Sequence, residues 1–530
     1  MALYFKQPCD EAVIASAPTA TPCPPRLGRW ILAATILGSS MSFIDGTAVN
    51  VALPSIQEDL SATLIQMQWV VEAYALLLAA LLLVGGSLGD RLGRRRIFAA
   101  GVVVFTLASL WCGLAPDVNQ LIIGRAIQGI GGALLVPGSL AIISASFSDE
   151  ARGRAIGTWS GFTAITAAAG PVLGGYLAET LSWRWIFFIN LPLAIIVLVV
   201  VLTRVPETKN EHATGHMDWA GAGLSVLGLG GLVYGLLESG SKGFDHPAVL
   251  VALATGVVSL ALFVLVQAKA SSPMMPLWIY RSRSFTGATI LTLFLYAALG
   301  GSLFLFPFNL IQVQGYTATA AGAAWLPFIV IIATLSRWAG GLITRYGAKL
   351  PLVIGPAVAA GGFGLLALTG IGGNYWLNYF PAIAVLGLGM AITIAPLVTV
   401  VMGSVTSDQA GVASGVNNAI SRTASLMAIA VLGVVALTVF NSSLDTKLAQ
   451  ANVPASVVLA LEDERVSLAG ARVPQDMDPE LRVAVERAID EAFISGFRVV
   501  MLIAVGLALA SSAVALVMVD SRHKIEAAAG

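Results

Sequence analysis

The sequence predicts an all-α protein that crosses a membrane fourteen times. The chain has 530 residues, of which 57% are hydrophobic and only 11% are charged, whereas a soluble protein carries about 25% charged residues. Its 29 Lys and Arg balance its 29 Asp and Glu, so neither a basic nucleic-acid surface nor a highly charged disordered chain is indicated. Apolar runs of about 20 residues, long enough to span a bilayer, recur along the chain.

Short charged or Gly/Pro-rich segments separate the apolar runs and mark the ends of the expected helices. The N-terminal residues 1–28 contain no apolar run of their own, so we expect the first span to serve as the insertion signal instead of a cleaved leader. The expected spans are 29–50, 67–88, 97–115, 119–143, 153–177, 184–203, 217–237, 247–268, 284–308, 319–341, 350–371, 376–402, 411–440 and 496–519.

Basic residues predict the orientation, because Lys and Arg are retained on the cytoplasmic side of a membrane. With the N-terminus inside, the inner segments hold 18 Lys and Arg, whereas the short outer loops hold only Arg184 and Lys242. Six more lie in the long outer segment from residue 441 and the start of the last span, but charges in long loops have little influence on membrane orientation. We therefore expect both termini to be cytoplasmic, as an even number of spans requires.

An internal repeat indicates two related halves. The segment Gly86 to Gly93 closes the second run and Gly340 to Gly347 closes the tenth, and the two share Gly, Leu, Arg and Gly in one register. Repeated halves are a common construction among polytopic membrane proteins. The predicted organisation is a cytoplasmic tail at 1–28, a six-helix bundle at 29–203, a linker with two additional transmembrane helices at 204–283, a second six-helix bundle at 284–519 that includes an outer loop at 441–495, and a cytoplasmic tail at 520–530.

Four stretches carry a family signature. They are Ile44 to Pro54 (IDGTAVNVALP), Gly86 to Arg95 (GSLGDRLGRR), Arg125 to Gly131 (RAIQGIG) and Gly170 to Gly175 (GPVLGG). Together with Ala410 to Gly415 they make the sequence resemble the major facilitator superfamily, and within it the fourteen-span drug:proton antiporter group. The resemblance implies the major facilitator fold, with two six-helix bundles and two extra central helices, in a bacterial plasma (inner) membrane.

The resemblance also implies a function. We expect export of hydrophobic or amphipathic compounds in exchange for protons by alternating access, with a small-molecule substrate, no cofactor and the proton gradient as the energy source. An exporter of one metabolite or lipid on the same fold, or a proton symporter for uptake, are the alternatives, because fold does not fix cargo. Contacts with the lipid bilayer are implied, none with nucleic acid, and a periplasmic adaptor is the one protein partner suggested. No enzyme motif is found.

Three ionisable residues are predicted to couple protons: Asp45, Glu72 and Arg125. Asp45 lies about 15 residues into the first span, roughly 22 Å from its inner end at 1.5 Å per residue, and the other two lie at a matching depth. Such groups are costly in a membrane unless they face water or a partner. The alternatives are a purely structural pair of Asp45 with Arg125, and a Glu72 side chain that reaches the surface.

Two glycine-containing segments are predicted to control the inner gate and the contact between bundles. The inner gate motif comprises Gly86, Asp90, Arg91, Gly93, Arg94 and Arg95. Asp90 is expected to accept hydrogen bonds from a helix N-terminus or from the arginines, although the arginines alone also suit topology. The antiporter motif comprises Gly170, Pro171, Gly174 and Gly175. Small residues at this spacing permit close helix packing, with or without a hinge.

Candidates for cargo binding are polar or aromatic residues in or near the spans. Most such residues pack against neighbours or anchor the interface, whereas Arg422, deep in the thirteenth run, suits an anionic group. The candidates are Tyr74, Gln128, Phe162, Phe308, Asn309, Trp325, Asn417, Asn418 and Arg422.

Two loops complete the predictions. His212 and His216 are spaced i,i+4 but have no third ligand nearby in the sequence, which favours a solvated linker over a metal site. In the outer loop, Asp478 and Pro479 predict the start of a helix whose apolar stripe ends before Gly496. This helix is expected either to cover the outer mouth as a lid or to lie on the membrane surface.

Overall fold

The structure is a computed structural model that describes residues 25–147, 149–209, 217–270, 273–405, 410–462, 464–471, 473 and 477–520. Within these ranges the chain forms helices and no strands, which confirms the all-α class. The predictions for the N-terminal tail up to residue 24, for His212 and His216 and for residues 521–530 lie outside the described residues.

The first part of the chain forms a group of helices in which α5 packs between α3 and α4, and α2 packs against both α6 and α8. Every long helix in this group carries apolar residues on all sides, as expected for helices that face other helices on one side and lipid on the other. These elements are α2 (Pro25–Asp59), α3 (Leu64–Leu92), α4 (Arg94–Leu114), α5 (Val118–Ser146), α6 (Asp149–Thr180), α7 (Trp185–Phe188) and α8 (Asn190–Arg204).

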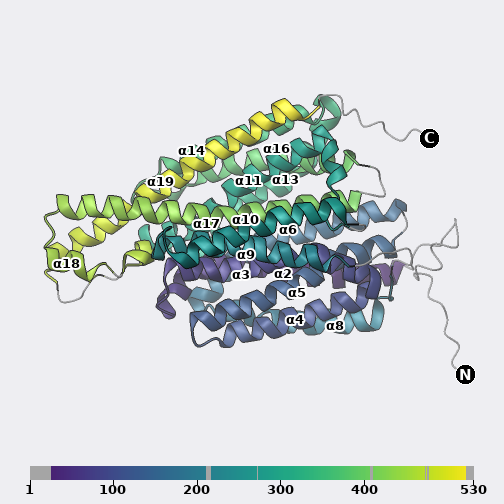
Figure 1. The fold of residues 1–530 in the computed structure, drawn as a ribbon, viewed down its shortest axis with the longest axis horizontal. Coiled ribbons are helices and arrows are strands. Elements are labelled where there is room, and N and C mark those ends of the chain that lie inside the picture. The colour runs from purple at the N-terminus through teal and green to yellow at the C-terminus, as the bar shows by residue number, and fades with distance from the viewer. Residues whose placement is uncertain are drawn as a thin grey trace, which may run out of the picture.

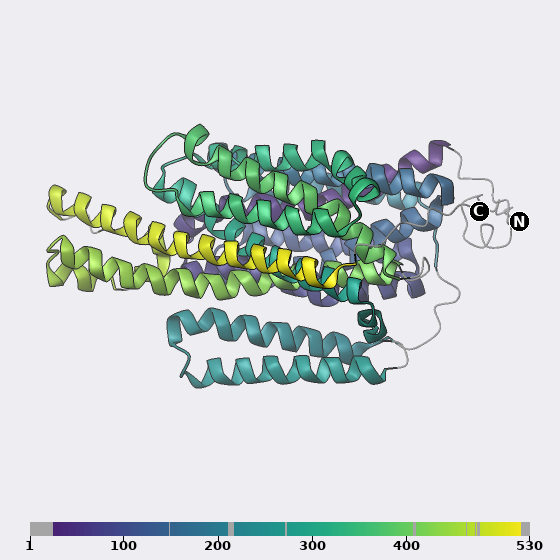
Figure 2. The same cartoon turned by 90° about the horizontal axis from the view of Figure 1, so that it is seen from above.

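A helical hairpin follows, formed by α9 (Trp219–Lys242) and α10 (Pro247–Lys269). Figure 2 shows this pair along one side of the main body. Helix α9 contacts α10, α3 and also α17 of the second half of the chain, whereas most side chains of α10 are not buried inside the protein. The pair therefore covers one side of the region where the two halves of the chain meet.

The second part of the chain repeats the pattern, with α11 packed against α17 and α19, and α14 packed against α16 and α19. Pro307 lies near the end of α11, where a π-helical turn follows. The elements are η1 (Leu277–Arg281), α11 (Arg283–Phe308), η2 (Asn309–Val313), α12 (Ala318–Ala323), α13 (Leu326–Tyr346), α14 (Lys349–Ala367), α15 (Tyr375–Asn378), α16 (Phe380–Gly403), α17 (Ala410–Gln450), α18 (Ala455–Ala460), η4 (Arg465–Gly470) and α19 (Pro479–Met518).

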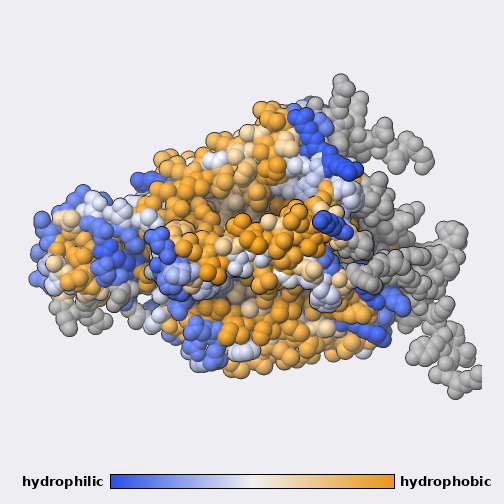
Figure 3. All heavy atoms as spheres, in the orientation of Figure 1, coloured by the Kyte–Doolittle hydropathy of each residue, from blue (hydrophilic) through white to orange (hydrophobic). Residues whose placement is uncertain are grey.

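The helices are those expected of a membrane protein. Thirteen helical segments of the described ranges are long and apolar enough to cross a bilayer, and α6, with 32 residues, lies beside α2 as the fourteenth. Figure 3 shows hydrophobic side chains over the helical body and hydrophilic ones gathered toward its two ends.

The long hairpin of α17 and α19 differs from the prediction. As expected, α19 begins at Pro479, and Asp478 caps it by accepting a hydrogen bond of 2.9 Å from the backbone N–H of Glu480. The predicted end before Gly496 is wrong, because α19 continues without a break to Met518. Gly496 stays helical and lets α17 approach closely, since a Cβ there would lie 2.9 Å from the carbonyl oxygen of Ala436.

This hairpin protrudes from one end of the molecule, and α18 and η4 connect its two arms (Figure 1). We call that end the hairpin end, and the opposite end, where α2 begins and α19 stops, the terminal end. Because the described chain starts and stops at the same end, the number of crossings is even.

Candidate functional site

An ion pair lies in the interior of the first group of helices. Asp45 of α2 and Arg125 of α5 are 0% and 1% exposed, and the Arg125 guanidinium donates a hydrogen bond to Asp45. In the middle of apolar helices each charge is costly alone, and removal of one partner would leave the other buried and uncompensated. The structure therefore brings together two of the three residues predicted to couple protons.

A side-chain network fixes this pair. Gln128, one turn after Arg125 on α5, donates to Asp45 at 2.8 Å and accepts from Arg125 at 2.8 Å. Its amide also donates to Ser109 of α4 at 3.3 Å, and Ser109 accepts from Asn190 of α8 at 2.9 Å. Four helices thus hold one polar cluster; Asp45 and Arg125 were predicted from the sequence to couple protons and Gln128 to contact cargo, whereas Ser109 and Asn190 were not predicted.

Further contacts hold Arg125 independently of Asp45. Its Nε donates to the backbone carbonyl of Val70 at 3.0 Å, and its guanidinium carbon lies 4.3 Å from the centre of the Tyr74 ring. The Tyr74 hydroxyl is bonded to the Ser42 hydroxyl at 2.6 Å. A cation stacked on an aromatic face is stabilised by the ring, so Arg125 has contacts that do not depend on Asp45.

Glu72 does not join this network. Its side chain is 0% exposed, so it does not reach the surface, and neither carboxyl oxygen has a hydrogen-bond partner among the residues that the structure describes. Similar depth in the membrane is therefore not the same as contact, and the predicted grouping of all three residues in one cluster is corrected to a pair plus a separate carboxyl.

The remaining cargo candidates lie mostly in the second half. Arg422 of α17 is half-buried, and no described residue forms a hydrogen bond or ion pair with it. Asn417 accepts from the Thr292 hydroxyl at 2.9 Å. The others are either packed or exposed: Phe308, Asn309 and Trp325 are buried, whereas Phe162 and Asn418 are exposed. Their role in binding cargo stays a prediction.

The gate loop between α3 and α4 is held at the terminal end. Gly93 has a φ of +114°, a conformation that favours glycine. Asp90 forms the predicted contact with an arginine, accepting from Arg94 Nε at 2.9 Å. The N-terminus of α4, however, is satisfied by Glu207, which accepts from the backbone N–H of Arg95 at 3.1 Å.

The segment after α8 makes further contacts with the start of α4. Thr208 accepts from the Arg94 backbone N–H at 2.8 Å through its carbonyl, and Glu207 also lies 3.6 Å from Arg95 Nε and 3.5 Å from Arg96 Nε. Sequence reasoning missed Glu207. The signal available was an acidic residue shortly after the sixth span, between Arg204 and Lys209.

The antiporter motif lets α6 pack closely against both halves. A Cβ at Gly174 would lie 2.6 Å from the carbonyl oxygen of Ala48 on α2, and one at Gly170 would lie 3.2 Å from that of Ile44. On the other side, a Cβ at Gly175 would lie 2.9 Å from the Cα of Thr319, beside α12. Helix α6 is therefore in backbone contact with α2 and with α12 at once.

Hydrogen bonds join the halves at the hairpin end. Glu179 of α6 accepts from the Thr319 backbone N–H at 3.0 Å. Gln57 of α2 accepts from Gln312 of η2 at 2.9 Å and donates to the carbonyl of Ser467 in η4 at 3.4 Å. These contacts close the hairpin end across the two halves, and a cavity of about 460 Å³ beside Gln57 is lined by the same elements.

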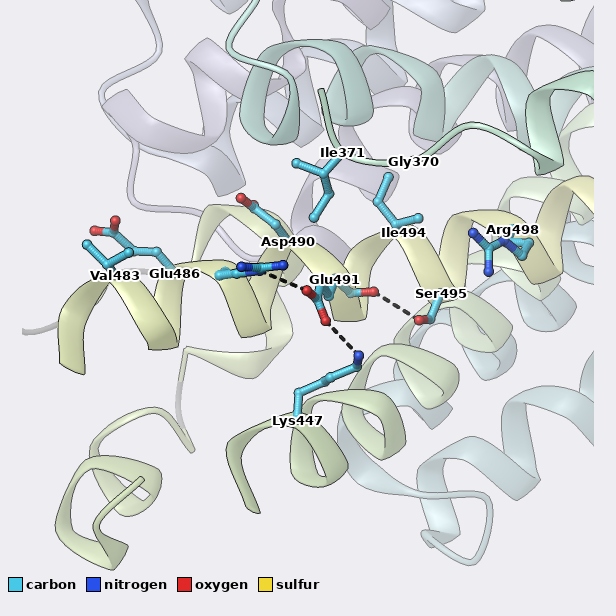
Figure 4. A pocket seen from close by; sticks show the side chains of 11 residues that line it. Gly370, Ile371, Lys447, Val483, Glu486, Asp490, Glu491, Ile494, Ser495 and Arg498 are labelled. Carbon is cyan, nitrogen blue, oxygen red and sulfur yellow. Dashed lines mark hydrogen bonds and ion pairs between the residues drawn. The ribbon is translucent and has the colours of Figure 1, made fainter. Parts of the chain in front are cut away.

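A second cavity, of about 630 Å³, lies on the hairpin itself (Figure 4). It is lined by α17, α19 and the segment after α14, and none of the predicted site residues lines it. Lys447 of α17 reaches across to Glu491 of α19 with a separation of 2.6 Å. The cavity is thus a feature of the hairpin and lies apart from the Asp45 network.

Thirteen helical segments of the described ranges that are long and apolar enough to cross a bilayer, with an ion pair buried between two of them, define a multi-pass membrane protein. The family model for the Major Facilitator Superfamily matches residues 35–430. The chain belongs to this superfamily, which confirms the resemblance drawn from the motifs.

Relatives are similar over nearly the whole length. The multidrug resistance protein Stp of Mycobacterium tuberculosis is 35% identical over 483 residues, which cover 89% of this chain and 88% of Stp. The tetracenomycin C resistance and export protein of Streptomyces glaucescens is 32% identical over 507 residues, 94% of this chain and 93% of the relative. Among solved structures, a bacterial homolog of the human lysosomal transporter Spinster, inward-facing and unoccupied, shares the fold with a TM-score of 0.62 at 16% identity, covering 93% of this chain and 98% of that one.

Proposed function

We propose that this chain exports hydrophobic or amphipathic small molecules in exchange for protons, with the proton gradient as its energy source and no cofactor. Two relatives are named for multidrug resistance and for resistance and export. The observation that carries the proposal is the buried pair of Asp45 and Arg125, because an ion pair inside the membrane marks a proton or substrate pathway by default.

The geometry links this pair to the contact between the halves. Asp45 lies two and three residues before Thr47 and Ala48, the α2 residues that face Gly170 and Gly174 of α6. When Asp45 takes up a proton it loses its ion pair, whereas Arg125 keeps the Val70 carbonyl. A resulting shift of α2 against α6 reaches α12 directly, since α6 packs on both.

We propose that the terminal end is cytoplasmic and the hairpin end external, in a bacterial plasma membrane. The excess of 18 basic residues over 2 supports this orientation. In that orientation the structure is closed to the outside. The predicted domain boundaries at 203 and 283 and a periplasmic adaptor remain part of the proposal.

The test uses the purified chain alone in proteoliposomes, with ethidium and a panel of neutral and anionic dyes as probes. We expect probe movement that is driven by an imposed pH gradient and collapses with it. Asp45→Asn should abolish the driven movement, whereas Glu480→Gln, an exposed acid at the start of α19, should not. Full uphill transport by Asp45→Asn would refute the coupling role. Movement of only one probe class favours a specific exporter, inward movement favours uptake, and activity only with an added extract points to an adaptor.

A further inference from the structure

Glu72 lies at the centre of an apolar face of α3. It follows Ile65 by seven residues and precedes Leu76 by four, and residues at this spacing share one face of an α-helix. Ile65, Leu76 and Ala80 belong to one buried cluster with residues of α9 and α17. The Glu72 carboxyl therefore sits on the face that these two helices cover.

Both covering helices are apolar at this level. The cluster includes Leu229, Val233 and Leu237 from α9, and Leu426 and Ala430 from α17, each between 0% and 6% exposed. One turn from Glu72, the Trp69 ring contacts Tyr234 of α9 at 6.2 Å between centroids. On the other flank, Gln68 donates to the carbonyl of Ile429 on α17 at 2.9 Å. The three helices thus enclose Glu72 without offering it a polar atom.

No described basic residue forms an ion pair with Glu72, and Arg125 on the neighbouring helix α5 is paired with Asp45. The other titratable or charged side chains on these three helices are Tyr74, Asp90, Arg91, Tyr234, Glu238, Lys242, Arg422, Asp445 and Lys447. None of them donates a hydrogen bond to its oxygens, which have no partner within the described ranges. Glu238 and Lys242 pair with each other at 2.8 Å. An isolated carboxylate in such surroundings is far costlier than the neutral acid.

We propose that Glu72 is a second proton-binding site, separate from Asp45, and that the extra helix α9 and helix α17 shield this site from water. Helix α3 belongs to the first half and α17 to the second, so relative movement of the halves opens this junction. Water then reaches Glu72, and its proton leaves. The inference rests on the proposed proton coupling and gives the extra helices a function: they complete a proton site that α3 and α17 alone leave open.

The first test asks whether Glu72 is protonated. The infrared carbonyl band of a protonated carboxylic acid should be present in the intact protein at neutral pH and lost in Glu72→Gln. The band should persist in the matched control Glu238→Gln, which removes a paired acid from α9. An undiminished band in Glu72→Gln overturns the proposal.

The second test counts protons in the conformational change without any cargo. Spin labels at Leu181→Cys and Leu377→Cys, both on exposed residues outside the buried contacts, report the distance between the halves as pH varies. The proton that Asp45 takes up and the proton that Glu72 releases in the same movement have opposite effects on the population ratio, and each alone changes the ratio by about tenfold per pH unit. We expect a nearly pH-independent ratio for the wild type, a dependence of about tenfold per pH unit for Glu72→Gln with the second conformation favoured at low pH, and a dependence of opposite sign for Asp45→Asn.

The outcomes are distinguishable. An unchanged slope in Glu72→Gln overturns the second site, whereas an unchanged slope in Asp45→Asn overturns the proposed function instead. Glu72→Asp keeps a titratable group at the same place, so it should retain the weak pH dependence of the wild type. If Glu72→Asp behaves like Glu72→Gln, the side chain has only a packing role and the inference fails.

Discussion

The close approach of α6 and α2 predicts a specific effect of Gly174→Ala. The new Cβ would lie 2.6 Å from the carbonyl oxygen and 2.7 Å from the Cα of Ala48. Ordinary van der Waals contact begins near 3.4 Å, so the two helices must separate by about 0.8 Å. Because both obstructing atoms belong to the backbone, no side chain can rotate away. Overpacking of this kind costs about 1–3 kcal/mol, offset by about 1 kcal/mol from the better helix propensity of alanine.

Gly157→Ala in the same helix is the matched control, because a Cβ there meets nothing within 4 Å. This variant should gain the propensity term alone. The assay is reversible unfolding of both variants in detergent micelles, followed by helicity. The free energy of unfolding of Gly174→Ala should fall below that of Gly157→Ala by about 1–3 kcal/mol, and transport driven by a pH gradient should decrease only in Gly174→Ala.

Equal unfolding free energies for the two alanine variants would refute the reasoning, since they would show that α2 and α6 do not touch at Gly174. Equal losses of transport in both would show that any added methyl group on α6 disturbs the cycle. In either case the backbone contact would not be the reason for a glycine at this position.

Three further predictions concern the polar contacts. Gln128→Met removes one hydrogen bond from each member of the buried ion pair. It should lower gradient-driven transport by about tenfold or more, since a buried polar group without a hydrogen bond costs about 1–3 kcal/mol. Unchanged transport rates would contradict this prediction. Gln312→Leu breaks the bond to Gln57 across the halves, so distances between spin labels at the hairpin end should shift toward open forms, and an unmoved distribution contradicts it. Glu207→Gln should raise amide hydrogen exchange at the N-terminus of α4. High salt should have the same effect on the wild type, because exposed charges are screened. If exchange responds to neither change, Glu207 does not hold the N-terminus of α4.

Depth along a helix was enough to predict the ion pair. Asp45 and Arg125 were placed at one level from the distance of each residue to the end of its span, and they do meet. Glu72 lies at a similar level but points toward α9 and α17. The direction in which a side chain points around the helix axis depends on which helix packs against that face, and the sequence of a single span does not contain this information.

The fold was predicted well because long apolar runs leave one solution in a membrane. The hairpin was predicted less well. The charged stretch after Pro479 reads as a separate surface helix, and Gly496 as its end, yet the glycine is helical because α17 lies against it. The packing partner is 60 residues away in the sequence (496 minus 436), so no local pattern contains it.

The two ends of the molecule are held by different forces. At the hairpin end, glycines of α6 bring backbones together, and Glu179 and the amides of Gln57 and Gln312 bridge the halves. At the terminal end, the loop before α4 is held by Glu207, Asp90 and arginines, of which Arg96 is largely exposed. Backbone packing is short-ranged and is lost completely once helices part, whereas charge contacts weaken gradually with distance. An alternating transporter opens each end in turn, and in this chain the contacts that must break between the halves at the hairpin end include backbone packing that is lost as soon as the helices part.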